Sequence, residues 1–226
     1  FSKELTCDFL ISNALYWYSE FHIDGLNIST VSSMIHPNIG LDSIDNSAIE
    51  FIRLLNTQVR ERFPYALMIA EESTDFPGVT KPVYEGGLGF THKRNTRWTN
   101  DTLKYMQTDP LLRSGLHSLM SFSLVDAFTE RHILALSHNE CVSGKNSIIN
   151  KMFGDDFHKF ASLRSYLTYM FTHPGNKLLF MGTEFGQATE WKHYEALHWA
   201  LLELENHQKL SCFVRELIHF YHKNKA

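Results

Sequence analysis

The chain has 226 residues, of which 43% are hydrophobic and 20% charged, as in globular proteins with a hydrophobic core. A net charge of −4 at pH 7 argues against a nucleic-acid partner, because such partners favour basic surfaces. The apolar runs are far shorter than the ~20 residues that span a bilayer, and the first 25 residues lack a signal-peptide pattern. Three scattered cysteines do not suggest a disulfide framework, so we expect a cytoplasmic protein without a membrane partner.

The spacing of apolar residues predicts helices and strands that alternate along the chain. Helices are expected over 8–21, from Ser47 to Pro64, and over 102–106, 120–129, 157–172 and 212–222. Ser47 with Glu50 three residues later is a capping-box pattern, which places the start of the second helix. Strands are expected over 23–30, 66–70, 90–98, 133–137 and 177–181. This alternation predicts a parallel sheet with helical crossovers, that is, an α/β fold.

Polar side chains stand at the ends of three expected strands. These are Asn27 and Ser29, then Glu71 and Glu72, then His138, Asn139 and Glu140. In parallel α/β folds the reactive groups gather at the carboxyl ends of the strands, so these residues are candidates for a site. The simpler alternative is that any parallel strand must end in polar residues near the surface.

Two further patterns do not indicate a metal or cofactor site. The 13 histidines form no zinc-like spacing with cysteines. Gly86 to Gly89 is expected to be a turn, because no Lys-Ser/Thr pair follows it as in a phosphate-binding loop. We therefore expect neither a metal nor a cofactor.

Seven stretches in one order carry a resemblance to a known family: 69–79, 86–90, 101–106, 136–138, 154–156, 177–182 and 184–186. With these stretches the chain closely resembles the 1,4-alpha-glucan branching enzymes of the alpha-amylase superfamily. The resemblance implies a parallel (β/α)8 TIM-type barrel, of which this chain has roughly strands four to eight with their helices. It also implies a single partial barrel domain over 1–226.

The resemblance assigns roles to the residues at the strand ends. A retaining glucan transferase needs a carboxylate nucleophile and an acid/base about 5 Å apart. Glu71 matches the acid/base, whereas Ser29 stands at the nucleophile position, where the family has Asp. Asn27 replaces an Arg beside that nucleophile, and Asn139 replaces a third Asp, which stabilises the transition state. His138 matches a substrate-contacting His.

Other matches lie further along the chain. Lys93, Asn95 and Trp98 match substrate-binding positions on one strand, where a family Trp is replaced by Arg94. A later loop keeps Glu190, Trp191 and Trp199, but an Asn and two Asp of the family become Lys192, Tyr194 and His198.

These departures predict an alpha-glucan protein that is catalytically impaired, and they leave open whether the chain is an enzyme. A serine without a base is a poor nucleophile. Glu140 is the more plausible substitute carboxylate by position, but the resemblance implies a Glu there beside the family's Asp, so we expect Glu140 to support the site rather than to react. One alternative is a non-catalytic module that binds glucan or assembles through open barrel edges, as a homo-oligomer or with a second chain that completes the barrel. Another is that a partner subunit donates the missing carboxylates.

Overall fold

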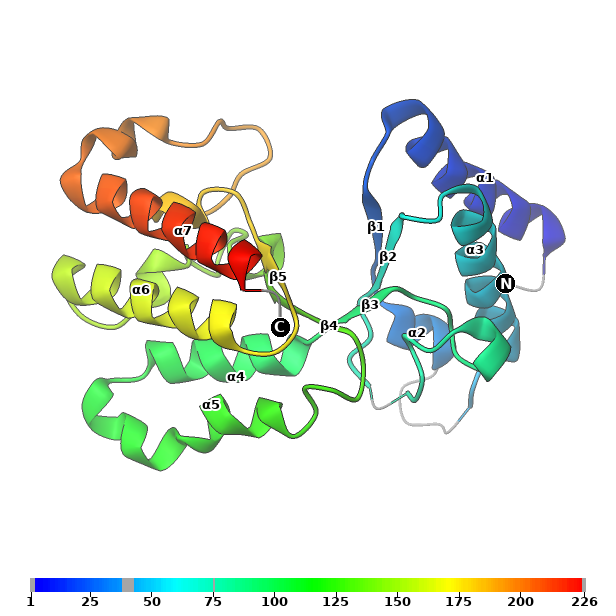
Figure 1. Cartoon of the computed structure of the whole chain (residues 1–226), viewed down its shortest axis with the longest axis horizontal. Coiled ribbons are helices and arrows are strands. Elements are labelled where there is room, and N and C mark those ends of the chain that lie inside the picture. The colour runs from blue at the N-terminus through cyan, green and yellow to red at the C-terminus, as the bar shows by residue number, and fades with distance from the viewer. Residues whose placement is uncertain (1–2, 38–42, 75, 225–226) are drawn as a thin grey trace. The chain divides into compact units, whose positions relative to one another are not determined.

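The computed structural model describes residues 3–37, 43–74 and 76–224, in which helices and strands alternate (Figure 1). The chain divides into two compact units, one formed by Phe1–Asn95 with Thr129–Ile133 and the other by Thr96–Phe128 with Leu134–Ala226. Each unit has its own hydrophobic core. The expectation of one domain over the whole chain stays a prediction.

The first unit is built on parallel strands that follow one another in the sequence. Its elements are α1 (Glu4–Phe21), β1 (Gly25–Ile28), α2 (Val31–Ile35), α3 (Asn46–Arg62), β2 (Leu67–Ala70), β3 (His92–Arg94) and the start of β4 (His132–Leu136). β1 pairs with β2 from Gly25–Leu67 to Ile28–Ala70, β2 pairs with β3, and β3 pairs with β4 at Arg94–Ile133. Helices α1 and α3 pack together beside this sheet.

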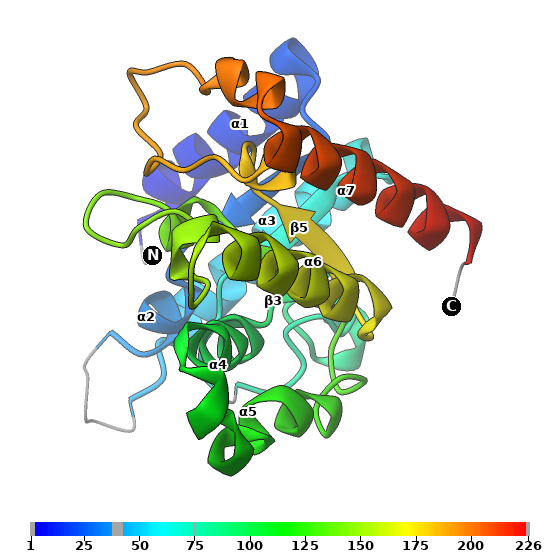
Figure 2. The ribbon, with the colours of Figure 1, turned by 90° about the vertical axis from the view of Figure 1, so that its left-hand side faces the viewer.

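The second unit contains the rest of β4 and the last strand. Its elements are α4 (Thr96–Gln107), α5 (Ser118–Ser121), α6 (Asp156–Thr172), β5 (Asn176–Leu179) and α7 (Glu205–Lys223). All five residues of β4 are buried, as expected of a strand covered on both faces. Helices α6 and α7 lie side by side, as Figures 1 and 2 both show. The strands follow the order β1-β2-β3-β4-β5, and the pairs β1–β2, β2–β3 and β3–β4 are parallel, which confirms the predicted parallel arrangement.

Several predicted boundaries are wrong: α1, α4 and α7, for example, all begin earlier than expected. Asp45, not Ser47, caps α3, because its carboxylate accepts bonds from the amides of Ser47 (2.9 Å) and Ala48 (3.2 Å). The single helix expected over 120–129 is replaced by 3-10 turns at Pro110–Leu116 and Phe122–Leu124 around the short α5. The strand expected over 90–98 ends at Arg94, and α4 begins at Thr96. Across the described residues, no helix has the length and apolar character needed to cross a bilayer.

Glu130 ties the loop between β2 and β3 to the start of β4. Its carboxylate accepts hydrogen bonds from the backbone amides of Val79 (2.9 Å) and Thr80 (2.8 Å) and from the Thr80 hydroxyl. Hydrogen bonds to a charged group stabilise by about 1.5–3 kcal/mol each, and donors left unpaired cost further.

We expect Glu130→Ala to lower the free energy of unfolding by about 2–3 kcal/mol, since it leaves the backbone amides of two buried residues, Val79 and Thr80, without their acceptor. Urea denaturation followed by circular dichroism measures this change. Glu85→Ala, at an exposed residue of the same loop, is the matched control and should stay within about 0.5 kcal/mol of the parent. Equal stabilities of the two variants would contradict this role of Glu130.

Candidate functional site

Ser29 and Glu71 occupy equivalent places at the ends of neighbouring strands. The last paired residues of β1 and β2 are Ile28 and Ala70, and Ser29 and Glu71 follow them directly. The Glu71 amide donates to the Ile28 carbonyl (2.9 Å), and the Glu71 carbonyl accepts from the Val31 amide (3.1 Å). The structure therefore brings the predicted acid/base and the replaced nucleophile position to the same edge of the first unit.

Arg94 pairs with Glu71. Its guanidinium nitrogen lies 3.3 Å from a Glu71 carboxylate oxygen, and the Arg94 side chain is only 5% exposed, against 23% for Glu71. An arginine placed so deeply needs a counter-charge, because an isolated buried charge is strongly unfavourable. Sequence reasoning noted Arg94 as a departure but missed this pairing.

A second ion pair joins the adjacent residues Glu72, which follows Glu71, and Lys93, which precedes Arg94. Glu72 is fully buried and accepts from the Lys93 ammonium at 2.7 Å, and it also binds the Thr74 amide at 2.7 Å. Lys93 donates in addition to the Thr74 carbonyl (3.1 Å). Successive residues of an extended backbone point to opposite sides, so Glu71 pairs with Arg94 while Glu72 pairs with Lys93. The predicted sugar contact Lys93 thus holds a carboxylate of its own protein.

The two predicted asparagines of the first unit differ in exposure. Asn27 is exposed in β1, in register with Ile69 of β2. Asn95 is half-buried just after β3, and its amide donates to the Ile133 carbonyl (2.9 Å). Asn27 lies within β1, two residues before Ser29, which follows the strand.

In the second unit, the end of β4 is a capped 3-10 turn, His138–Glu140. The Glu140 carboxylate accepts from the amide (2.6 Å) and hydroxyl (2.7 Å) of Ser137, and the Asn139 amide donates to the same hydroxyl (3.3 Å). Glu140 therefore caps this turn, which weakens its claim as a substitute nucleophile. Asn139 is half-buried, while His138 is exposed.

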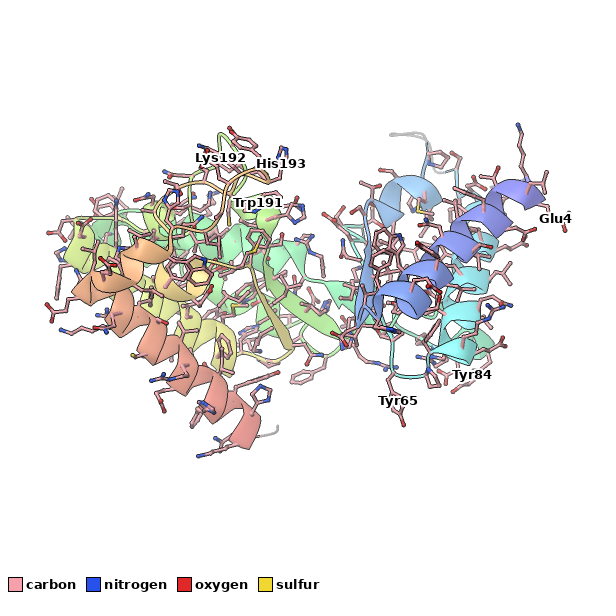
Figure 3. All side chains as sticks on the ribbon, turned by 90° about the horizontal axis from the view of Figure 1, so that it is seen from above. Glu4, Tyr65, Tyr84, Trp191, Lys192 and His193 are labelled. Atoms are coloured by element: carbon pink, nitrogen blue, oxygen red, sulfur yellow. The ribbon has the colours of Figure 1, made fainter. Side chains whose placement is uncertain are left out.

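His138 stands in an aromatic cluster with Phe180 and Trp191. Its ring centre is 6.0 Å from that of Phe180 and 6.1 Å from that of Trp191. Figure 3 shows Lys192 and His193 at the outer tip of the loop that carries Trp191. The cluster brings residues that follow β4 and β5 into contact. The sequence alone did not indicate that His138 and Trp191 lie together.

Glu190, next to Trp191, organises a neighbouring loop. Its carboxylate accepts from the amides of Gly144 (3.1 Å) and Asn146 (2.6 Å). These bonds, from Asn146 first and Gly144 second, hold the pKa of Glu190 below its usual value. Glu190 is thus a loop anchor that stays ionised at neutral pH.

Cys141 is the nearest thiol to this end of β4, and burial raises its pKa to about 11, with the charge of Glu140 adding to the effect. A thiolate is the reactive form of cysteine, so Cys141 is inert near neutral pH. It offers no replacement nucleophile.

Trp98 is a core residue of the second unit. It is 0% exposed, and its ring stacks on Tyr166 (5.8 Å between centres) and Tyr169 (6.3 Å). The ring has no face open to a sugar, which corrects the expectation of a substrate contact. Sequence reasoning placed Trp98 on a strand, whereas it lies in α4.

The predicted residues fall into two groups. The first unit holds Asn27, Ser29, Glu71, Lys93 and Asn95. The second unit holds Trp98, His138 and Asn139. Asn139 therefore belongs to a different unit from Ser29 and Glu71. Within the described ranges, no three His, Cys, Asp or Glu side chains form a group able to hold a metal ion.

Sequence comparison finds close relatives. The 1,4-alpha-glucan branching enzyme of Bacillus subtilis (strain 168) is 50% identical over 218 residues, which cover 96% of this chain and 35% of that protein. The enzyme of the same name from Halothermothrix orenii is 46% identical over 237 residues, covering 100% of this chain and 38% of its own length. No family model matches the chain.

Structure comparison finds alpha-amylase-type folds. The type III pullulan hydrolase from Thermococcus kodakarensis superposes with a TM-score of 0.70 at 18% identity, over 100% of this chain and 37% of that one. Cyclic alpha-maltosyl-(1→6)-maltose hydrolase from Arthrobacter globiformis gives 0.67 at 15%, over 99% and 45%. At such low identity these matches speak for the fold alone, and they support the predicted partial (β/α)8 barrel.

The sequence identity, the strand order and the matched stretches all indicate the same kind of (β/α) barrel protein. The chain spans about a third of the length of the curated relatives it matches. Over that region, the chain is a homologue of the 1,4-alpha-glucan branching enzymes.

Proposed function

We propose that this chain is a branching-enzyme-like alpha-glucan protein whose own branching chemistry is impaired. The family reaction cleaves an alpha-1,4 linkage and transfers the chain to a 6-hydroxyl by a retaining double displacement. The observation that carries the proposal is Ser29, which directly follows β1 at the same sheet edge as Glu71, where the reaction needs a carboxylate. We propose a cytoplasmic location, and a glycogen-like or starch-like glucan as the ligand or substrate.

The replaced side chains lack the chemistry of double displacement. A hydroxyl needs a general base within hydrogen-bonding reach to act as a nucleophile. The carboxylate at the neighbouring strand end, that of Glu71, is already paired with Arg94. Asn139 has the shape of Asp without the charge that favours an oxocarbenium-like centre. Losing a nucleophile costs about 10⁴- to 10⁶-fold in turnover in well-studied hydrolases.

The Arg94 pair supports impairment at the remaining carboxylate. General acid catalysis requires a carboxyl proton within reach of the leaving oxygen. The Arg94 guanidinium engages a Glu71 oxygen at 3.3 Å from a nearly buried position. It competes with a sugar oxygen for that carboxylate.

The exposed His138 and its aromatic neighbours are the residues that we propose contact glucan. His138 offers a hydrogen-bonding ring beside Trp191 and Phe180, and aromatic side chains with a polar neighbour suit amphipathic ligands such as sugars. With Asn139, these residues form the proposed contact surface in the second unit.

The second candidate function is an interaction module. β1 stands at one end of the strand order and β5 at the other, so within the described residues each has one strand neighbour. Open edges present unpaired backbone groups that favour association. The module would assemble as a homo-oligomer or with a second chain that completes the barrel.

Incubation of the purified chain with amylose tests the proposal. We expect no new alpha-1,6 branch points above background, because the nucleophile position holds a hydroxyl. Debranching followed by chain-length analysis measures them. Branches that form in the parent and vanish in Glu71→Gln would contradict the proposal and direct attention to Glu140 or a partner chain.

Titration of the same samples with maltoheptaose separates the two candidates. We expect binding that weakens about tenfold in His138→Ala, the loss of roughly one hydrogen bond. His193→Ala, at an exposed His near Trp191, is the matched control. No measurable affinity in a folded sample would favour the interaction module.

A double-mutant cycle on Glu71→Gln and Arg94→Met measures the ion pair. We expect each single change to lower the free energy of unfolding by about 1–2 kcal/mol, discounted from values for fully buried pairs because Glu71 is partly exposed. The double variant should lose less than the sum. Urea unfolding supplies the four values, and additivity within about 0.5 kcal/mol would show that the pair contributes nothing.

A further inference from the structure

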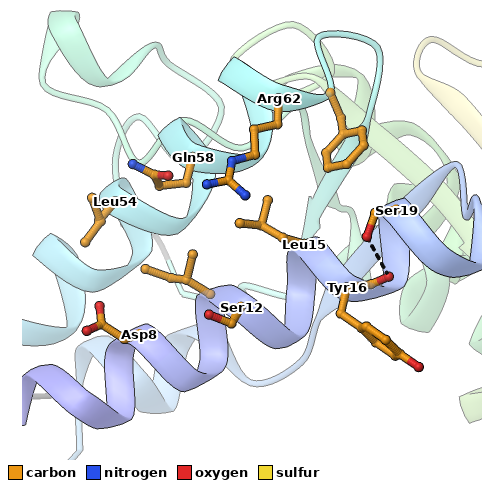
Figure 4. Close-up of a pocket in the computed structure, with 10 residues that line it drawn as sticks. Asp8, Ser12, Leu15, Tyr16, Ser19, Leu54, Gln58 and Arg62 are labelled. Carbon is orange, nitrogen blue, oxygen red and sulfur yellow. Dashed lines mark hydrogen bonds between the residues drawn. The ribbon is translucent and has the colours of Figure 1, made fainter.

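A groove of about 700 Å³ lies between helices α1 and α3 of the first unit. Figure 4 shows Ser12 and Leu15 of α1 turned toward this groove, opposite Gln58 and Arg62 of α3. Both helices belong to one compact unit, and the lining includes Ile11 and Leu15, which are buried in the core of that unit. The shape of the groove is therefore set by elements that this core holds in place.

Four polar side chains line the groove without a partner in the protein. Their side chains make no hydrogen bond or ion pair with any described residue, and they are Asp8, Ser12, Gln58 and Arg62. Figure 4 shows Asp8 near one end of the groove and Arg62 toward the other. Polar groups that converge on a hollow and have no partner of their own are available to a ligand.

These four side chains offer both hydrogen-bond donors and acceptors. The Asp8 carboxylate only accepts and the Arg62 guanidinium only donates, whereas the Gln58 amide and the Ser12 hydroxyl do both. One acid and one base cancel in charge, so the groove does not favour a strongly anionic ligand such as a nucleotide. An uncharged ligand that is rich in hydroxyl groups, which donate and accept, can satisfy all four.

The groove also has apolar surface and the length for a chain of sugars. Leu15 and Phe63 line it, and the Phe63 ring is held by stacking on Tyr18, with 5.2 Å between ring centres. Sugar rings can lay their C–H faces on such surface while their hydroxyls meet the polar groups. Asp8 and Ser19 both line the groove and are 11 residues apart, ~16 Å along the helix axis. The groove is thus longer than one sugar ring and suits a linear oligosaccharide.

A second hollow adjoins the groove at Arg62. It measures about 300 Å³ and shares Arg62 and Phe63 with the groove. Its lining adds Asp24 and Tyr65, and Tyr65 is 97% exposed. An exposed aromatic ring beside a carboxylate is a further contact for a sugar, so an oligosaccharide that leaves the groove past Arg62 has a surface to follow.

We propose that the groove between α1 and α3 binds a linear, uncharged oligosaccharide, as a second alpha-glucan site of this chain. This rests on the proposed function, which supplies glucan as the ligand, and it adds a site on the first unit, whereas the His138 surface belongs to the second. Asp8 is the one carboxylate among the described residues that line the groove. Glycosyl transfer needs a pair of carboxyl groups, so the groove holds glucan without cleaving it.

Isothermal titration calorimetry with maltoheptaose tests the groove in the His138→Ala background, where the surface of the second unit is weakened. Ser12→Trp places an indole in the groove without breaking a side-chain contact, and we expect Kd to rise at least about tenfold. Asn13→Trp is the matched control, because this exposed residue of α1 does not line the groove and points about 100° away from Ser12. It should leave Kd unchanged, and equal Kd values for the two Trp variants would overturn the proposal.

The same variants separate this proposal from the proposed function. Maltoheptaose binding that His138→Ala abolishes and Ser12→Trp leaves intact would overturn the groove site but not the glucan ligand. No binding by any folded variant would overturn both. Sedimentation equilibrium of the samples without sugar adds a further check. A dimer that dissociates in Ser12→Trp but not in Asn13→Trp would assign the groove to a second copy of the chain and overturn the glucan site.

Discussion

The end of β2 depends on charge compensation by β3. Two glutamates follow the strand, one fully buried and one largely covered, and each meets a cation from the neighbouring strand. Buried carboxylates without such partners are strongly unfavourable. Because successive side chains alternate in direction, Lys93 and Arg94 can serve Glu72 and Glu71 separately. This pairing sets where Glu71 lies and what competes for its carboxylate.

The consequence for chemistry follows from where the departures lie. Asn27 lies in β1 and Ser29 follows it, Arg94 reaches Glu71, and Asn139 lies in the turn after β4. The residues that pack the cores, such as Trp98 between Tyr166 and Tyr169, keep their structural roles. The chain thus combines a scaffold similar to that of its relatives with an altered set of polar groups at the strand ends.

The parallel strands could be predicted because each is a short apolar run between helical patterns. Other features depend on contacts between residues that are far apart in the sequence, or on competition between neighbouring residues. Asp45 and Ser47 both have short oxygen side chains near the start of α3, and either type can cap a helix. In the structure Asp45 accepts from the amides of Ser47 and Ala48 and is the cap. The Arg94–Glu71 pair requires the register between β2 and β3, and the burial of Trp98 requires knowing that α4 starts two residues before it. The turns at 110–124 are too short to give a periodic signal.

A segment exchange tests the central claim most directly. The 218 matched residues of the Bacillus subtilis branching enzyme would be replaced by the corresponding region of this chain, with branching activity as the readout. The account predicts a folded but inactive hybrid that regains activity when Ser29→Asp, Asn27→Arg, Asn139→Asp and Arg94→Trp are introduced together. A hybrid that branches amylose efficiently without these four changes would contradict it.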